Sequence, residues 1–202
     1  MIIETSFEQH SEDWHDARLD SIGGTDISKI ITTKGVRSAS REDFLVDKAS
    51  QIITRRSKPI FPSYEMKWGT EHEPAARRLF EWKKDIELSE CAMIFNDEKR
   101  NWHISPDGFN EKLETGWETK CPQLKEFRKT IAGNKLPTGH ILQIQTSLAL
   151  TGWEKWWFMS FFPGLKPFMI EVKRNDDLIR IIKVEVQMFI NDLGRLIDEL
   201  KS

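Results

Sequence analysis

Two short segments of the chain carry side chains whose types and spacing suit phosphodiester chemistry. Ser105–Gly108 reads Ser-Pro-Asp-Gly, and Glu118–Lys120 follows after nine residues as Glu-Thr-Lys. Phosphodiester hydrolysis is helped by a hard cation such as Mg²⁺, which prefers oxygen ligands and keeps several waters. The cation polarises the phosphate and lowers the pKa of a bound water, and a nearby lysine can orient that water or stabilise charge. This combination is typical of a magnesium-dependent nuclease site.

The spacing brings these groups together if the segments form strands. Side chains of a strand alternate between its two faces, so Glu118 and Lys120 are expected to project together. Asp107 stands before Gly108, just after a strand expected at 101–104, and a hairpin could carry it back over Glu118. The alternative is an ordinary Pro-Asp-Gly turn beside an exposed charge pair, because acid-x-lysine sequences also occur by chance.

The remaining patterns predict the elements that hold these residues. Thr70 and Glu73 have the form of a capping box that opens a helix, with Pro74 in its first turn. Residues 57–63 contain two prolines and are expected to form a loop. The order of elements predicts an α/β fold, in which a mixed β-sheet is flanked by helices and a helical layer precedes it. The expected helices are 13–20, 25–32, 40–55, 70–84, 137–151 and 175 onward, and the expected strands are 92–95, 102–104, 116–121, 155–162 and 168–173.

Composition indicates a folded globular chain in a reducing compartment. The 202 residues are 31% charged and 39% apolar, which suits one domain over residues 1–202 with a sizeable core. No apolar run reaches the roughly 18 residues of a membrane span, and no basic segment followed by an apolar one marks a secretion signal. Two cysteines, Cys91 and Cys121, are too few for a disulfide framework. We therefore expect a cytoplasmic protein with no membrane partner.

Charge is unevenly distributed, although the net charge is only −2. Five basic residues and one acid lie within 120–135. Such runs are usually solvated faces, but they could also form a basic side that follows a phosphate backbone. The other two basic runs are Lys29, Lys34, Arg37 and Arg41, and then Arg55, Arg56 and Lys58.

Five segments, in order along residues 14–145, resemble the lambda-exonuclease (YqaJ-type viral recombinase) family of the PD-(D/E)xK nuclease superfamily. Residues 146–202 match only in general layout. The resemblance implies a restriction-endonuclease-like core. The matching segments are Trp14–Leu19 with Ile22–Thr25, Trp68–Glu73 with Ala76–Glu81, Ser105–Gly108, Glu118–Pro122, and Leu142–Gln145.

The resemblance implies catalytic roles. Asp107 and Glu118 correspond to the magnesium ligands, and Lys120 to the lysine beside the attacking water. Glu73 corresponds to a helix acid that completes the carboxylate set, and Gln143 to a glutamine that lines the same site. Without the resemblance, Glu73 is a capping-box residue and Gln143 is a polar residue on an exposed helix face.

The resemblance also implies DNA contacts. Arg18 corresponds to an arginine that grips a terminal 5′-phosphate, a task suited to guanidinium geometry; otherwise it is a surface charge. Thr25 stands where relatives often have a serine near that phosphate, and Ser105 adds a phosphate contact. Met66 falls near an apolar residue that separates the strands at the duplex end, although it could equally be core. Arg37, from the second basic run, is a further candidate for DNA binding.

The function implied is a phage-type 5′→3′ exonuclease on double-stranded DNA ends. Two Mg²⁺ ions, or Mn²⁺, would support hydrolysis to mononucleotides and leave a 3′ single-stranded tail for recombination. Relatives form ring-shaped homotrimers and work with a single-strand-annealing recombinase, in the bacterial host of a phage or prophage. The alternatives are a structure-specific endonuclease of the same superfamily and a catalytically inactive DNA-binding subunit. The Arg18–Thr25 segment favours the exonuclease, because an endonuclease has no terminal phosphate to bind.

Overall fold

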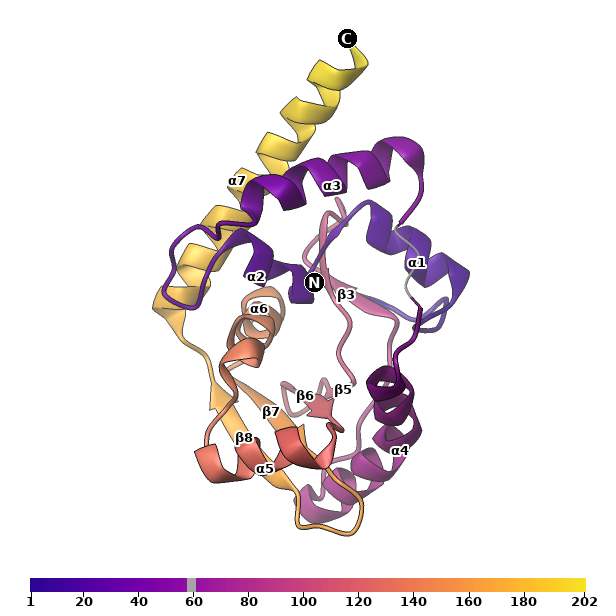
Figure 1. Ribbon diagram of the computed structural model, residues 1–202, viewed down its shortest axis with the longest axis vertical. Helices are drawn as coiled ribbons and strands as arrows, with labels where there is room; N and C mark the ends of the chain where they lie inside the picture. The colour runs from indigo at the N-terminus through magenta and orange to yellow at the C-terminus, as the bar shows by residue number, and fades with distance from the viewer. Residues whose placement is uncertain (58–60) are drawn as a thin grey trace.

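The strands form two separate four-stranded sheets in the computed structural model, which describes residues 1–57 and 61–202 (Figure 1). In the first sheet β2 runs parallel to β4 and the other pairs are antiparallel. In the second sheet β6 runs parallel to β7, between two antiparallel edge strands. The first sheet has the order β1 (Ile2–Glu4), β3 (Met93–Phe95), β4 (Trp102–Ile104), β2 (Ile22–Gly23), and the second β5 (Gly108–Asn110), β6 (Thr115–Lys120), β7 (Lys155–Ser160), β8 (Phe168–Lys173).

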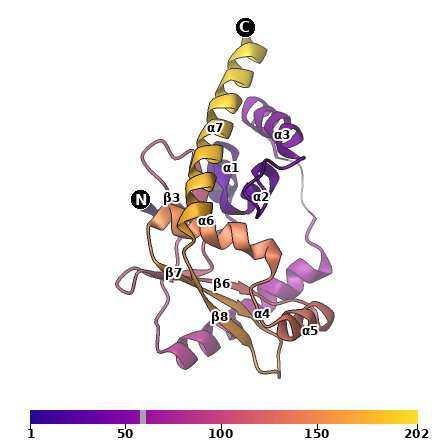
Figure 2. The ribbon, with the colours of Figure 1, turned by 90° about the vertical axis from the view of Figure 1, so that its left-hand side faces the viewer.

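Helices surround both sheets. In Figures 1 and 2, α3 lies beside the long α7, whereas α4 and α5 lie near the second sheet, at the other end of the molecule from the C-terminus. None of the helices within the described residues is long and apolar enough to cross a membrane. The helices are α1 (Glu12–Leu19), the 3₁₀ turn η1 (Gly24–Asp26), α2 (Ile27–Ile30), α3 (Arg41–Thr54), α4 (Tyr64–Lys84), α5 (Leu124–Gly133), the 3₁₀ turn η2 (Thr138–His140), α6 (Ile141–Thr151) and α7 (Asp176–Lys201).

The α/β class and the longer elements are confirmed. The helices expected at 13–20, 40–55, 137–151 and 175 onward occur with small shifts of their ends, as does the hairpin of β7 and β8. The helix α7 begins where Asn175 accepts a hydrogen bond from the backbone N–H of Leu178 at 3.1 Å. Its apolar stripe then packs into the main core at Ile182, Val186, Phe189 and Leu193.

The start of α4 corrects one prediction. The helix begins at Tyr64, because Ser63 Oγ accepts a hydrogen bond from the backbone N–H three residues on at 3.3 Å. The predicted capping box at Thr70 and Glu73 is therefore wrong, since both residues lie inside the helix. Pro74 is also interior rather than in the first turn. Glu73 is thus free to face the second sheet instead of capping its own helix.

Other differences concern short or weakly patterned elements. The expected single sheet is two sheets, with strands 93–95 and 102–104 in one and 115–120 in the other. The expected helix 25–32 is a 3₁₀ turn followed by the four-residue α2. The helix α5 and the strands β1 and β5 were not expected, because each buries too few apolar side chains to show a period. The loop expected at 57–63 includes residues 58–60, which lie outside the described part of the chain, as does Lys58 of the third basic run.

The packing of α4 on the second sheet determines where Glu73 lies. Ala76 and Phe80 are buried in a cluster with Trp117 and Met159 of the two central strands. Residues three and four apart lie on the same face of a helix. Glu73 therefore comes one turn before Ala76 on the face that is turned toward the sheet.

Candidate active site

A hairpin brings Asp107 against the central strand of the second sheet. The strands β5 and β6 are antiparallel, with Gly108 opposite Trp117. The carboxylate Oδ2 of Asp107 accepts a hydrogen bond from the backbone N–H of Thr119 at 2.7 Å. The Pro-Asp-Gly sequence thus leads into a strand rather than forming an isolated surface turn, and Asp107 is fixed beside Glu118.

The Glu-Thr-Lys segment forms the end of β6. Lys120 Nζ lies 2.5 Å from Glu118 Oε1, so the two side chains share a face of the strand, as the alternation predicts. The Glu118 side chain is only 4% exposed, whereas that of Lys120 is 40% exposed. The pair is therefore largely buried on the Glu118 side, rather than being an exposed surface pair.

Acidic groups concentrate around this pair. Burial raises the pKa of Asp107 well above its usual value, and the charge of Glu118 raises it further. Burial also raises the pKa of Glu73, with Glu118 again adding to the effect, although Lys120 opposes it. These carboxylates repel one another, so the site favours a cation that neutralises them.

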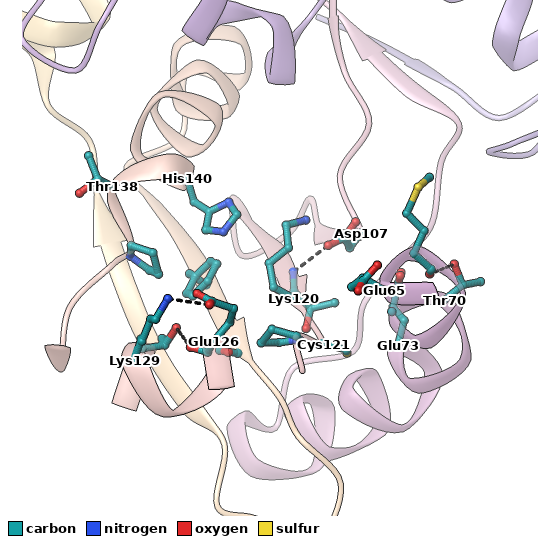
Figure 3. Close-up of a pocket in the computed structure, with 18 of the residues that line it drawn as sticks. Glu65, Thr70, Glu73, Asp107, Lys120, Cys121, Glu126, Lys129, Thr138 and His140 are labelled. Atoms are coloured by element: carbon teal, nitrogen blue, oxygen red, sulfur yellow. Dashed lines mark hydrogen bonds and ion pairs between the residues drawn. The ribbon is translucent and has the colours of Figure 1, made fainter. Parts of the chain in front are cut away.

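Lys120 keeps its proton in these surroundings. Burial by itself lowers the pKa of Lys120, but the carboxylates of Glu118 and Asp107 outweigh burial and raise it above the ordinary lysine value. In Figure 3 the Lys120 side chain lies between His140 and Asp107, with Glu73 and α4 on the far wall. The carboxylates therefore favour the protonated form of Lys120, which is a hydrogen-bond donor.

The site opens into a cavity of about 830 Å³. Its walls come from the N-terminal segment, α4, the end of β6, α5, the 3₁₀ turn η2 and β7. The cavity is large enough for a nucleotide. Residues in these walls include Gln9, His10, Met66, Thr70, Glu73, Asp107, Lys120, Lys129, Lys135, Thr138, His140 and Ser160.

The donor set fits a hard divalent cation. Within residues 1–57 and 61–202, no three His, Cys, Asp or Glu side chains form a ready-made metal cage. Mg²⁺ does not require one, because it is usually held by one or two carboxylates together with waters. The paired acids Asp107 and Glu118, with Glu73 nearby, offer only carboxylate oxygens and no sulfur or nitrogen ligand of the kind zinc prefers.

Gln143 lies behind the site rather than in its wall. Its side chain hydrogen-bonds to His140, which does line the cavity. The His140 ring stacks on Phe158 with centroids 5.1 Å apart, and burial lowers its pKa, as does the charge of Lys120. The sequence analysis missed His140; its position three residues before Gln143, and so on the same helix face, was the available signal.

Gln9 is a second residue that the sequence analysis missed. Its side-chain amide donates hydrogen bonds to the carbonyl oxygens of Cys91 at 2.9 Å and Pro106 at 3.0 Å. The second bond holds the peptide that precedes Asp107. Nothing in the local sequence signals contacts between residues so far apart.

The structure links Arg18 to the Ser105–Gly108 segment. Its guanidinium lies 4.4 Å from the ring centroid of Trp14, and Trp14 Nε1 donates a hydrogen bond to Ser105 Oγ at 3.2 Å. Ser105 is two residues before Asp107, so Trp14 connects Arg18 to the segment that carries Asp107. Thr25, in η1, is exposed.

Met66 and Arg37 have different placements. Met66 lies in the first turn of α4, is 51% exposed and lines the cavity, so it is not a core residue. Arg37 lies outside the cavity wall and forms an ion pair with Glu185 of α7 at 2.9 Å. Its neighbour in the second basic run, Arg41, pairs with Asp192 at 2.6 Å. These two arginines of the run therefore connect to α7, whereas Lys29 of the same run pairs with Asp26 at 2.8 Å.

Comparisons with known proteins identify the family and the fold of the chain. A family model described as YqaJ-like viral recombinase domain matches residues 13–154. The structure of LHK-Exo, an alkaline exonuclease from Laribacter hongkongensis, superimposes with a TM-score of 0.85 at 28% identity, covering 95% of this chain and 96% of that one. LHK-Exo in complex with dAMP gives a TM-score of 0.84, again at 28% identity and the same coverage.

A phage-related exonuclease from Haemophilus somnus 129PT shares the fold, with a TM-score of 0.71, 13% identity, and coverage of 89% of this chain and 96% of that one. A comparison with curated proteins gave no match. The fold expected from the PD-(D/E)xK motif is confirmed, and the family model covers most of the chain, including Asp107, Glu118 and Lys120. The chain therefore belongs to the YqaJ-like viral recombinase family, the lambda-exonuclease family of PD-(D/E)xK nucleases.

Proposed function

We propose that this protein is a phage-type exonuclease that removes nucleotides from the 5′ end of one strand of double-stranded DNA. The observation that carries the proposal is the hairpin that holds Asp107 against Thr119, so that Asp107 and Lys120 both line one cavity while the buried Glu118 contacts Lys120 beside it. LHK-Exo, similar over nearly its whole length, is an exonuclease and binds dAMP. Products of this protein would be mononucleotides and a 3′ single-stranded tail.

The residues divide the chemistry between them. Asp107 and Glu118 would hold Mg²⁺, or Mn²⁺, and two such ions would polarise the scissile phosphate and supply an activated water. Lys120, kept protonated by its neighbours, donates hydrogen bonds to the attacking water or to a phosphate oxygen. Glu73 completes the acidic wall, and Gln143 acts through His140.

A further group of residues would bind the end of a DNA strand. Arg18 binds the terminal 5′-phosphate, and Ser105 and Thr25 supply hydroxyl groups nearby. Met66, exposed at the rim of the cavity, separates the terminal bases. Arg37 contacts DNA only if its pair with Glu185 opens. The remaining proposals, a ring-shaped homotrimer, a single-strand-annealing partner and a cytoplasmic location in a phage-infected bacterium, rest on family membership.

The test is nucleotide release from linear duplexes with 5′-phosphate or 5′-hydroxyl ends and from closed circles, with Mg²⁺ or with chelator. Digestion of linear DNA alone, lost with chelator and in Lys120→Ala, supports the proposal. The matched control is Lys183→Met, which replaces an exposed lysine on α7. Nicking of closed circles would identify an endonuclease instead, and absence of any metal-dependent cleavage would identify a catalytically inactive subunit.

A further inference from the structure

A buried lysine lies directly behind Arg18. Lys48, in the middle of α3, is only 3% exposed. Its Nζ donates a hydrogen bond to the backbone carbonyl oxygen of Arg18 at 2.6 Å. Lysine is rarely buried without a paired acid, so this placement requires a reason.

The hydrogen bond secures the last turn of α1. The final carbonyls of a helix lack partners within it. Here Lys48 satisfies that of Arg18, while Ser21 Oγ donates to the carbonyl of Ala17 at 2.8 Å. Ser21 is also hydrogen-bonded to His103 Nδ1 at 2.7 Å. The turn that carries Arg18 is therefore held from α3 on one side and from β4 on the other.

The surrounding charges do not balance. Within residues 1–57 and 61–202, no carboxylate forms a salt bridge with Arg18 or with Lys48. The nearby acid Asp26 is bound to Lys29 at 2.8 Å and accepts a hydrogen bond from the backbone of Gly23 at 3.2 Å. Burial lowers the pKa of both Arg18 and Lys48, to about 8 for Lys48. Two mostly buried cations thus lie near two acids that are already engaged, Asp26 with Lys29 and Asp20 with Arg55, an arrangement that favours an incoming anion.

We propose that Lys48 is a positioning residue of the strand-end site, which fixes Arg18 and adds a second positive charge that selects a terminal phosphate monoester. This inference rests on the proposed function, in which Arg18 binds that phosphate. A phosphate monoester carries a charge of about −1.5 to −2 at neutral pH, whereas an internal phosphodiester carries one negative charge. Two cations match the terminal group better than they match an internal phosphate or a 5′-hydroxyl.

The experiment measures the preference for a 5′-phosphate over a 5′-hydroxyl end. Binding of labelled duplexes is followed by fluorescence anisotropy with chelator present, so that no cleavage occurs, and kcat/KM is measured separately with Mg²⁺. The variants are Lys48→Met, which keeps the length but removes the charge and the donor, and Lys48→Arg. Lys183→Met is the matched control, because it removes the charge of an exposed lysine on α7 and leaves the ion pair of Asp26 with Lys29 intact.

We expect Lys48→Met to reduce the binding preference by about tenfold, as for a lost hydrogen bond to a charged group, chiefly through KM. Lys48→Arg should restore most of the preference and Lys183→Met should keep it. Asp26→Asn, which removes the neighbouring negative charge, should increase the preference, and this readout remains if Lys48→Met does not fold.

Equal losses on both kinds of end in Lys48→Met would show a structural role only, and would overturn the proposal. An unchanged preference in both Lys48→Met and Asp26→Asn would also overturn it. If the wild-type protein digests DNA but has no preference, the role of Arg18 fails together with that of Lys48, while the nuclease proposal stands.

Discussion

The backbone N–H of Thr119 donates a hydrogen bond to Asp107 Oδ2 at 2.7 Å, so the acid of one motif is held by the main chain of the other. The bond uses one carboxylate oxygen and leaves the second available to the cavity. It also joins β5 to β6 beyond the last paired residues of the hairpin. One interaction thus contributes both to the local fold and to the geometry of the acidic site.

Replacing Asp107 can separate these two contributions. In Asp107→Asn the amide oxygen can still accept the hydrogen bond from Thr119, but the negative charge is lost. We expect Tm to stay near that of the wild type, while Mg²⁺-dependent nuclease activity falls by at least about a hundredfold, as for removal of a principal electrostatic group. Asp107→Ala should lose both properties. Thermal unfolding and nucleotide release check this, and an active Asp107→Asn would exclude Asp107 as a metal ligand.

Arg18 should act through geometry as well as charge. Lysine cannot reproduce the planar fork of donors that binds a phosphate, or the stacking on Trp14. We expect Arg18→Lys to raise KM for 5′-phosphorylated duplexes by roughly tenfold, with little change for 5′-hydroxyl ends. Steady-state kinetics on the two substrates check this. Equal effects on both substrates would mean that Arg18 supports α1 rather than a terminal phosphate.

Gly116 is required for packing of the second sheet. A Cβ atom at this position would lie 2.2 Å from the Trp156 indole, on the neighbouring parallel strand. We expect Gly116→Ala to destabilise the protein by about 3 kcal/mol, at the upper end for overpacking of a core. Gly194→Ala is the control, since its Cβ would meet no atom within 4 Å and lies inside α7; it should stabilise by ~0.5 kcal/mol. Urea unfolding measures both, and equal stabilities would contradict the packing.

His103 should make the fold sensitive to acid. Burial lowers its pKa from 6.5 to about 3, and the charge of Arg18 adds to the effect. The folded protein therefore binds fewer protons than the unfolded chain between these values. The contribution of neutral His103 to the free energy of unfolding is therefore fully present above pH 6.5. It is lost as the pH falls from 6.5 toward 3, by about 1.4 kcal/mol for each pH unit.

The measurement is the free energy of unfolding in urea at pH 7, 6 and 5. Replacement of His103 by Asn should lower stability at pH 7, because the bond to Ser21 changes, but should flatten the slope between pH 6.5 and 5. An unchanged slope in the variant would assign the acid sensitivity to carboxylates elsewhere.

Local patterns predicted the residues that act along one strand or one helix. Alternation placed Glu118 and Lys120 on one face of β6, and the helical period gave α7, because both depend only on neighbours in sequence. The capping box at Thr70 failed although its local pattern was correct, because Ser63 begins the helix two turns earlier. The N-cap is the residue at which the chain first becomes helical. The sequence pattern alone does not decide whether that residue is Ser63 or Thr70.

Contacts between distant segments could not be predicted in this way. Gln9 holds the carbonyl of Pro106, and Lys48 that of Arg18, through single hydrogen bonds across different elements. Neither residue stands in a motif, and each looks like an ordinary polar residue in sequence. The helix α5 was missed for a related reason: Phe127 is its only fully buried apolar residue, so its sequence appears only as a basic run.

The contact of Lys120 with Glu118 has a consequence for how variants are interpreted. At 2.5 Å the ammonium serves as an internal counter-ion, which neutralises part of the crowded acidic wall when no metal is bound. Removing Lys120 therefore takes away a group of the proposed reaction and at the same time leaves the acids uncompensated, so the protein becomes more dependent on divalent cations for its stability. Activity lost on substitution of Lys120 combines these two effects, whereas the uncharged amide in Asp107→Asn reduces the repulsion and reports on the chemistry more directly.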